Sequence, residues 1–134
     1  MAYKILLFMK RRPGMSPEAF RDYYENHHVP LCLGSTRRMA RYLRRYLEPQ
    51  PNAETGLNAE LPYDVITELW FEDEAVYRAT VQHLSTTAMS DEIVQDELQL
   101  FDRAKTRMAT VVECETAPSA LDPRVGDSKP ATGS

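Results

Sequence analysis

Two adjacent histidines, His27 and His28, stand in the segment YYENHHVPL, and His83 is the only other histidine of the chain. An imidazole changes its charge near neutral pH, so a histidine at the end of a helix is a candidate general acid or base. The alternative is structural, with His28 donating one hydrogen bond to a backbone carbonyl and fixing the turn before Pro30. Adjacent histidines cannot easily present both rings to one ion, and no third ligand has suitable spacing. We therefore expect no metal site.

A dense group of arginines is the second candidate for chemistry. Its members are Arg37, Arg38, Arg41, Arg44 and Arg45. It can be a solvated surface, a nucleic-acid footprint, or a clamp for an acidic substrate. On an extended strand, Arg44 shares a face with Tyr42 and Tyr46, while Arg41 and Arg45 face the other way. Because a nucleic-acid site needs a continuous basic face, and the formal net charge is −4, we expect no nucleic-acid partner.

Glu68 is the third candidate, because it lies beside Trp70 on one face of the apolar segment YDVITELWF. Burying an unpaired carboxylate is costly, so Glu68 should either line a polar cavity or pair with an arginine. A salt bridge to Arg44 or Arg45 is the alternative to a catalytic role.

The elements that position these groups begin with a strand over residues 3–10, which is apolar on both faces. Ser16 is a natural N-cap and Pro17 a suitable first residue for a helix over residues 17–28. Pro30 disfavours a helical Val29, so this helix should end at the histidines. Its buried stripe is predicted to consist of Phe20, Tyr23, Tyr24, His27 and His28.

The segment 39–48 is ambiguous: its periodicity alone favours a helix, although its apolar residues also fit a strand, and the topology of the whole chain decides for the strand. The rest of the chain predicts a strand over 63–71, helices over 73–84 and 90–101, and a strand over 107–115. Reading 39–48 as a strand completes a β-α-β-β-α(α)-β order. This is the ferredoxin-like split βαβ arrangement, an α+β fold with a four-stranded antiparallel sheet.

Residues 1–115 should form one domain, with a long loop at 48–62 and a flexible tail at 116–134, where prolines and glycines concentrate. No segment approaches the roughly 18 uninterrupted apolar residues of a membrane helix, and we expect a cytoplasmic protein without a membrane partner. The only cysteines, Cys32 and Cys114, lack the spacing of a thiolate zinc site or a disulfide framework.

Helices on one face of the sheet leave the other face bare, although three of the strands are apolar on both faces. Exposing several large apolar side chains would lose much of the stability of a small domain. We therefore predict a homodimer in which two sheets face each other and enclose a cavity.

Several short motifs, in this order, resemble the EthD family of the dimeric α+β barrel superfamily. They are LLFMKRRPGMSPEAFRDYYENHHVPL, RYLRRYL, PYDVITELWFED and DELQLFDRAKTRMATVVE, which together span about residues 3–115. The resemblance supports the strand at 39–48, and it singles out His28, at the H-x-P position, over His27. It leaves the reaction open, because related folds serve several chemistries.

The resemblance and the residue inventory together predict an enzyme that needs no cofactor and acts on an aromatic or polyketide-derived acid between sheet and helices. A lyase, either a decarboxylase or a dehydratase, is favoured. The alternatives are a cofactor-free monooxygenase or isomerase, and a non-catalytic accessory protein of an oxygenase system. Haem is a further alternative that the colour of the protein would reveal. The expected catalytic residues are His28, Tyr46 and Glu68, and the expected substrate-binding residues are Phe8, Tyr42, Arg44 and Trp70.

Overall fold

A computed structural model describes residues 2–35, 38–86, 90–122 and 124 of the chain. Its elements in chain order are β1 (Tyr3–Met9), α1 (Pro17–Tyr23), the π-helix η1 (Tyr24–His28), α2 (Val29–Ser35), β2 (Arg41–Tyr46), β3 (Val65–Phe71), α3 (Glu74–Ser85), α4 (Asp91–Leu98), the 3-10 helix η2 (Arg103–Lys105), β4 (Arg107–Thr110) and α5 (Pro118–Leu121). The predicted order of strands and helices is therefore confirmed, and the ambiguous segment is a strand.

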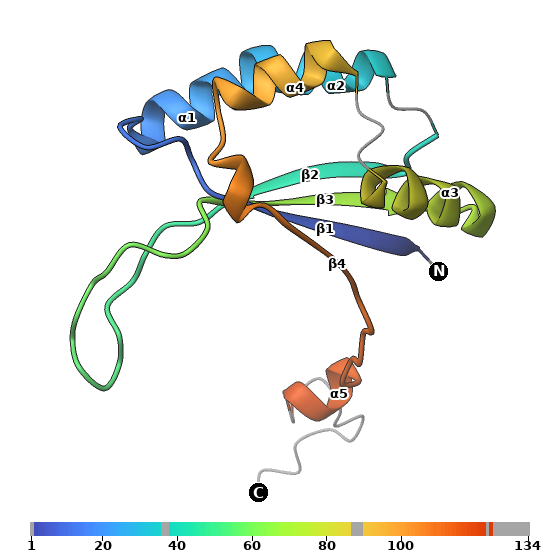
Figure 1. The fold of residues 1–134 in the computed structure, drawn as a ribbon. Helices are drawn as coiled ribbons and strands as arrows, with labels where there is room; N and C mark the ends of the chain where they lie inside the picture. Colours follow the sequence, from blue (N-terminus) through green and yellow to red (C-terminus); the bar gives the residue numbers. More distant parts are fainter. Residues whose placement is uncertain (1, 36–37, 87–89, 123, 125–134) are drawn as a thin grey trace, which may run out of the picture.

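The four strands form one antiparallel sheet in the order β2-β3-β1-β4. Figure 1 shows α1, α2 and α4 as a layer over one face of this sheet, with α3 over one end of the same face. In the part of the chain that the structure describes, the opposite face carries no helix layer. This is the ferredoxin-like arrangement predicted from the sequence.

Side-chain caps begin the three longer helical segments, and the cap at Ser16 is the one that the sequence predicts. The hydroxyl of Ser16 accepts a hydrogen bond from Ala19 N at 3.1 Å, at the start of α1. Asp73 caps α3, and Ser90 caps α4. Each cap satisfies a backbone N–H that would otherwise have no intrahelical partner.

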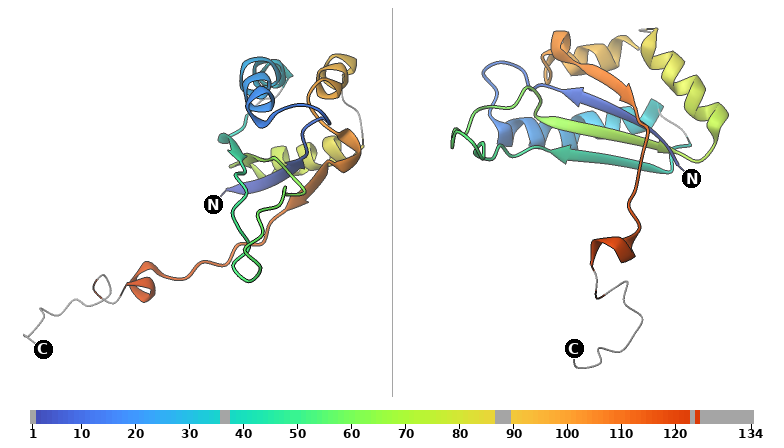
Figure 2. Two further views of the ribbon diagram at one scale, coloured as in Figure 1. Left: turned by 90° about the vertical axis from the view of Figure 1, so that its left-hand side faces the viewer. Right: turned by 90° about the horizontal axis from the view of Figure 1, so that it is seen from below.

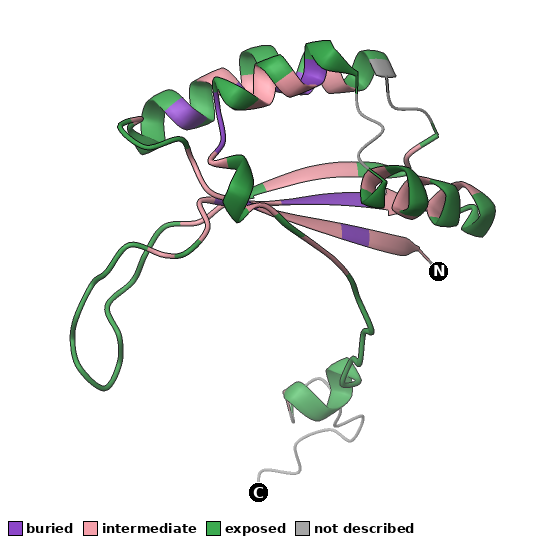
Figure 3. Cartoon of the chain, viewed as in Figure 1, coloured by how far each residue is buried: buried purple, intermediate pink, exposed green. Residues whose placement is uncertain are grey.

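The core lies between the helix layer and the sheet, where buried residues gather on β3 and on the inner faces of the helices (Figure 3). One cluster packs Phe20 and Tyr24 against Phe101, and a second surrounds Ile5 and Phe71. The side chains of β2 and β3 alternate between faces, so Tyr42, Arg44 and Tyr46 point toward the helices while Arg41 and Arg45 belong to the open face.

The predicted end of the first helix at the histidines is wrong. Val29 has helical backbone angles (φ −60°, ψ −51°), and helix continues through Pro30 to Ser35. In an ordinary α-helix the proline ring would clash with the carbonyl of residue 26, four positions earlier. Here the N–H of Val29 bonds to the carbonyl of Tyr24, five residues back, and this wider π-turn gives the ring room.

The π-turn also changes which histidine is buried. His28 is only 4% exposed, whereas His27 lies on the exposed side, so the prediction that both rings face the sheet is wrong for His27. An α-helical stripe advances about 100° per residue, and one extra residue in a turn shifts every later side chain around the axis.

The last strand is shorter than the predicted 107–115. β4 pairs with β1 only from Arg107 to Thr110, and the chain then leaves the sheet. Beyond that point Val112 is 95% exposed, and the ion pair of Lys4 with Glu113 ties the segment to the sheet. Because β4 is an edge strand, it pairs with one neighbouring strand only, and fewer inter-strand hydrogen bonds stabilise it beyond Thr110.

Two segments project from the domain (Figure 2). One is the long loop at 48–62, exposed along almost all its length, and the other follows β4. Of the predicted tail at 116–134, residue 123 and residues 125–134 lie outside the described residues. Across the described segments, we find no helix that combines the length and apolarity needed to cross a membrane.

Candidate functional site

A cavity of about 590 Å³ lies between the helix layer and the helix-facing side of the sheet. This volume is within the range of about 300–1,000 Å³ that small-molecule sites occupy. Apolar side chains from the sheet and the helices, among them Leu7, Leu69 and Ile93, form much of its wall. The cavity can therefore bind an apolar ligand, and its few polar side chains determine which chemistry the site could perform.

His28 is the polar group that the sequence singled out, and it lines this cavity. Its ring Nδ1 lies 2.8 Å from Oδ2 of Asp96 on α4. Tyr23 donates its hydroxyl hydrogen bond to the other oxygen of Asp96, Oδ1, at 2.6 Å. An ionised carboxylate only accepts hydrogen bonds, so Nδ1 carries the proton and Nε2 of the neutral ring is an acceptor. The pair has the orientation that acid–base histidines require.

Cys32 stands next to the accepting nitrogen, one helical turn beyond His28. Its Sγ lies 3.4 Å from Nε2 of His28, and its thiol also lines the cavity. Burial raises the pKa of Cys32 to about 12, and the carboxylates of Glu97 and Asp96 act in the same direction. The thiol is therefore protonated near neutral pH and donates to Nε2, which argues against a nucleophilic thiolate.

A chain of hydroxyl groups continues from this thiol across the cavity floor. The side chain of Tyr42 hydrogen-bonds Cys32, and Tyr24 hydrogen-bonds Tyr42. The hydroxyls of Tyr24 and Thr67 lie 2.5 Å apart. Because each hydroxyl carries one proton and Cys32 donates to His28, the donors run in one direction, from Thr67 through both tyrosines to the thiol.

The two tyrosines of this chain are hydrogen-bond donors rather than bases. Burial raises the pKa of Tyr42 above its ordinary value, and it raises the pKa of Tyr24, which is buried in the core, well above its ordinary value. Both therefore keep their protons at neutral pH. Tyr42 lines the cavity, so its hydroxyl can turn from Cys32 to a bound carbonyl and stabilise a developing oxyanion there.

Arg44 and Tyr46 share the face of Tyr42 but hold Glu25 instead of facing the cavity. Arg44 donates from Nε and Nη2 to the two carboxylate oxygens of Glu25, at 2.9 and 2.8 Å, and Tyr46 donates its hydroxyl to the same carboxylate. The hydrogen bond from Arg44 lowers the pKa of Glu25, although partial burial opposes it. This bidentate pair leaves Arg44 committed to a protein partner.

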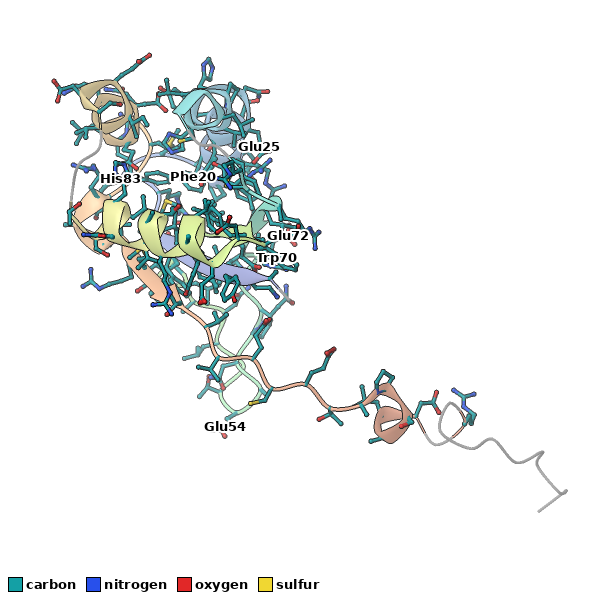
Figure 4. All side chains as sticks on the ribbon, turned by 90° about the vertical axis from the view of Figure 1, so that its right-hand side faces the viewer. Phe20, Glu25, Glu54, Trp70, Glu72 and His83 are labelled. Atoms are coloured by element: carbon teal, nitrogen blue, oxygen red, sulfur yellow. The ribbon has the colours of Figure 1, made fainter. Side chains whose placement is uncertain are left out.

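The remaining predicted site residues, Phe8, Glu68 and Trp70, lie on the open face of the sheet. Glu68 pairs with Arg45 and accepts a hydrogen bond from Nε1 of Trp70 at 2.9 Å. The structure therefore shows the salt bridge that was the alternative to catalysis. Figure 4 shows Phe20 nearer the helix layer than Trp70, and His83 on the side of α3 nearer α4. The sheet therefore lies between His28 and the three residues Phe8, Glu68 and Trp70.

Sequence reasoning missed Asp96, which orients His28, and three polar residues of the cavity wall, namely Cys32, Tyr24 and Thr67. A helix extended past Pro30 would have placed Cys32 four residues after His28 and on its face. Tyr24 was predicted to be buried, but without a polar role. Asp96 and Thr67 have no local signal, because their partners are distant in sequence. Among the described residues, no group of three or more acidic, histidine or cysteine side chains could hold a metal ion.

Comparisons with known proteins agree with this architecture. A family model described as the EthD domain matches residues 12–104. The fold is similar to a crystal structure of an ethyl tert-butyl ether D (EthD) family protein from Bacillus halodurans, with a TM-score of 0.52 at 16% identity, covering 85% of this chain and 100% of that one.

It is also similar to the Arabidopsis thaliana protein At3g17210, with a TM-score of 0.51 at 15% identity, covering 86% of this chain and 98% of that one. The search of curated proteins finds no match.

Proposed function

The chain belongs to the EthD family, and from that premise we propose that its cavity is the active site of a lyase for planar aromatic or polyketide-derived acids. The observation that carries the proposal is the pair of the buried His28 and the partly buried Asp96 beside an apolar cavity. We further propose that the reaction uses only side chains of this protein and no cofactor.

In the proposed reaction His28 moves the proton and the hydroxyl chain stabilises the enolate. For a β-hydroxy acid, Nε2 of His28 takes the proton from the α-carbon, the electron pair forms the carbon–carbon double bond, and hydroxide leaves. The imidazolium then gives that proton to the hydroxide, so the products are the unsaturated acid and water. Asp96 holds the ring and stabilises its charged form during the step.

For a β-keto acid the same groups serve a decarboxylation. The bond to the carboxylate carbon breaks, carbon dioxide leaves, and the electron pair remains on an enolate that accepts a hydrogen bond from Tyr42. For this step His28 enters as the imidazolium, and Nε2 delivers its proton to the enolate carbon. The neutral ring then takes a proton from water, and the hydroxide that remains combines with carbon dioxide as bicarbonate. A substrate atom must replace the Cys32 thiol in front of Nε2, and a thiol hydrogen bond is weak enough to be displaced.

The test uses two simple probes, 3-hydroxy-3-phenylpropanoate for dehydration and benzoylacetate for decarboxylation. We expect the protein to accelerate formation of cinnamate or release of carbon dioxide. The variant His28→Gln should catalyse the reaction about 10²–10⁴-fold more slowly than the wild type, because glutamine has no nitrogen that takes up and gives back a proton near neutral pH. His27→Gln is the matched control, since His27 is exposed and should leave the rate unchanged. A wild-type rate equal to the uncatalysed rate for both probes, or full activity in His28→Gln, would contradict the proposal.

We also propose a homodimer through the open face of the sheet. Leu6, Phe8 and Ile66 are only half-buried there in the single chain, and the ring of Trp70 contacts the cations of Lys4, at 3.8 Å, and Arg41, at 4.5 Å. A second copy of the sheet would remove this apolar surface from water without any new element.

A further inference from the structure

Arg38 lies at the mouth of the cavity, three residues before the first residue of β2. It belongs to the cavity wall, yet its side chain is 68% exposed, whereas the side chain of His28 is 5% exposed. Within the described part of the cavity wall, Arg38 is the only side chain with a permanent positive charge. The negative charge of Glu97 in the same wall is already paired with Arg103 at 3.1 Å. The cavity wall is therefore largely apolar, with one arginine at its opening.

The backbone of Arg38 is in the left-handed region, with φ of 65°. Residues other than glycine adopt this region rarely, and such residues are found disproportionately at functional sites. Two residues later, Ala40 N bonds to Trp70 O at 2.7 Å, which joins the chain to the sheet. The unusual conformation therefore places the arginine where the chain enters β2, beside the opening.

Asp73, the partner of Arg38 in the structure, uses only part of the hydrogen-bonding capacity of the Arg38 guanidinium. Nη2 of Arg38 lies 3.2 Å from Oδ2 of Asp73, and both side chains are largely exposed. The other oxygen of Asp73 caps α3 by accepting from Ala75 N and Val76 N. An exposed ion pair contributes little stability, and a guanidinium has five N–H donors in a planar fork. A ligand carboxylate can therefore bind the guanidinium of Arg38 beside Asp73, or replace Asp73, at a small cost in free energy.

We propose that Arg38 binds the carboxylate of an aromatic acid whose ring system fills the apolar cavity, with the reacting carbons toward His28. This inference deepens the proposed function and rests on it, because it names the charged end of the substrate and its orientation. Arg44, the arginine expected from the sequence to hold this group, is bonded to Glu25. A salt bridge would stabilise the charge that decarboxylation removes, so this orientation favours dehydration or a second, unreactive carboxylate.

The experiment compares binding of 2-naphthoate with that of its uncharged analogue 2-naphthamide by isothermal titration calorimetry. We expect wild-type protein to bind naphthoate about fivefold more tightly than naphthamide, the range of a partly exposed ion pair. Arg38→Gln should abolish this preference while leaving naphthamide affinity unchanged. Arg78→Gln on α3 is the matched control, because it removes an equal charge from a residue outside the cavity wall and should keep the preference.

Asp73→Asn tests the competition directly, since asparagine still caps the helix but does not compete as an anion. Naphthoate should bind this variant about twofold more tightly. A preference for naphthoate that survives in Arg38→Gln would overturn the role of Arg38 while leaving the aromatic cavity intact. Binding of neither ligand by wild-type protein would overturn the proposed function, and the inference with it.

Discussion

Asp96 accepts a hydrogen bond from Nδ1 of His28 at 2.8 Å, although 68 residues separate the two in the chain. The contact joins α4 to the π-turn η1 and fixes the ring so that Nε2 faces Cys32 and the cavity. The same carboxylate holds the hydroxyl of Tyr23. One acidic residue thus determines both the orientation and the tautomer of the histidine.

Replacing Asp96 by asparagine should lower turnover of the two phenyl probes by about 10²–10⁴-fold, because an amide can hold the wrong tautomer of His28. The rate measured across pH should also change shape, which a merely structural loss would not cause. Asp91→Asn in the first turn of α4 is the control, and it should keep the wild-type rate and profile. Unchanged turnover in Asp96→Asn would exclude the pairing from the mechanism.

Cys32 should resist alkylation while Cys114 reacts. The pKa of about 12 leaves roughly one Cys32 thiol in ten thousand ionised at pH 8, and burial restricts access to it. Cys114 is exposed. Iodoacetamide treatment followed by peptide mass spectrometry should therefore label Cys114 alone, and Cys114→Ser protein should stay unlabelled. Equal labelling of both cysteines would show that the cavity floor is more open than the structure indicates.

The pair of Glu25 and Arg44 should make stability depend on pH. The hydrogen bond from Arg44 lowers the folded-state pKa of Glu25, so its stabilisation is present above the unfolded-state pKa and is lost as pH falls through the folded-state pKa. Solvent screening limits the effect, because the carboxylate is 35% exposed.

We expect Glu25→Gln to reduce the free energy of unfolding by about 0.5–1 kcal/mol at pH 7. This deficit should shrink below pH 4.5, the ordinary pKa of the group, and vanish in stronger acid. Urea titrations from pH 3 to pH 7 measure the difference. Glu18→Gln on the same helix, where the side chain is exposed, is the control. A deficit that does not change with pH would mean that the lost interaction is not electrostatic.

The open sheet face should mediate dimerisation. Sedimentation at micromolar concentration should show a wild-type dimer and a folded monomer for Leu6→Asp, since a buried charge without a partner is costly at an interface. Leu57→Asp in the long loop, where the leucine is 69% exposed, should leave the dimer intact. A wild-type monomer, or a stable Leu6→Asp dimer, would contradict the homodimer proposal. Circular dichroism checks that the variant folds.

Most of the order of strands and helices follows from the sequence because its causes are local. Alternation and apolar runs identify most of the strands, and a capping residue such as Ser16 marks a helix start. The segment 39–48 is the exception, because its periodicity favours a helix and only the topology of the whole chain indicates a strand. The same alternation assigns Arg44 and Arg45 to opposite faces and leads to the pairing of Glu68 with Arg45. The EthD motifs indicated the family, and the H-x-P motif favoured His28 over His27 as the functional histidine.

Only the tertiary structure decides which of these groups act together. The π-turn carries the helix past Pro30 and buries one histidine of the pair, an outcome that the general bias against helix before proline does not contain. The partnership of His28 with Asp96 and the capture of Arg44 by Glu25 join elements far apart in the chain. Periodicity says which side chains share a face, but packing decides which face meets the cavity and which partner each charge finds there.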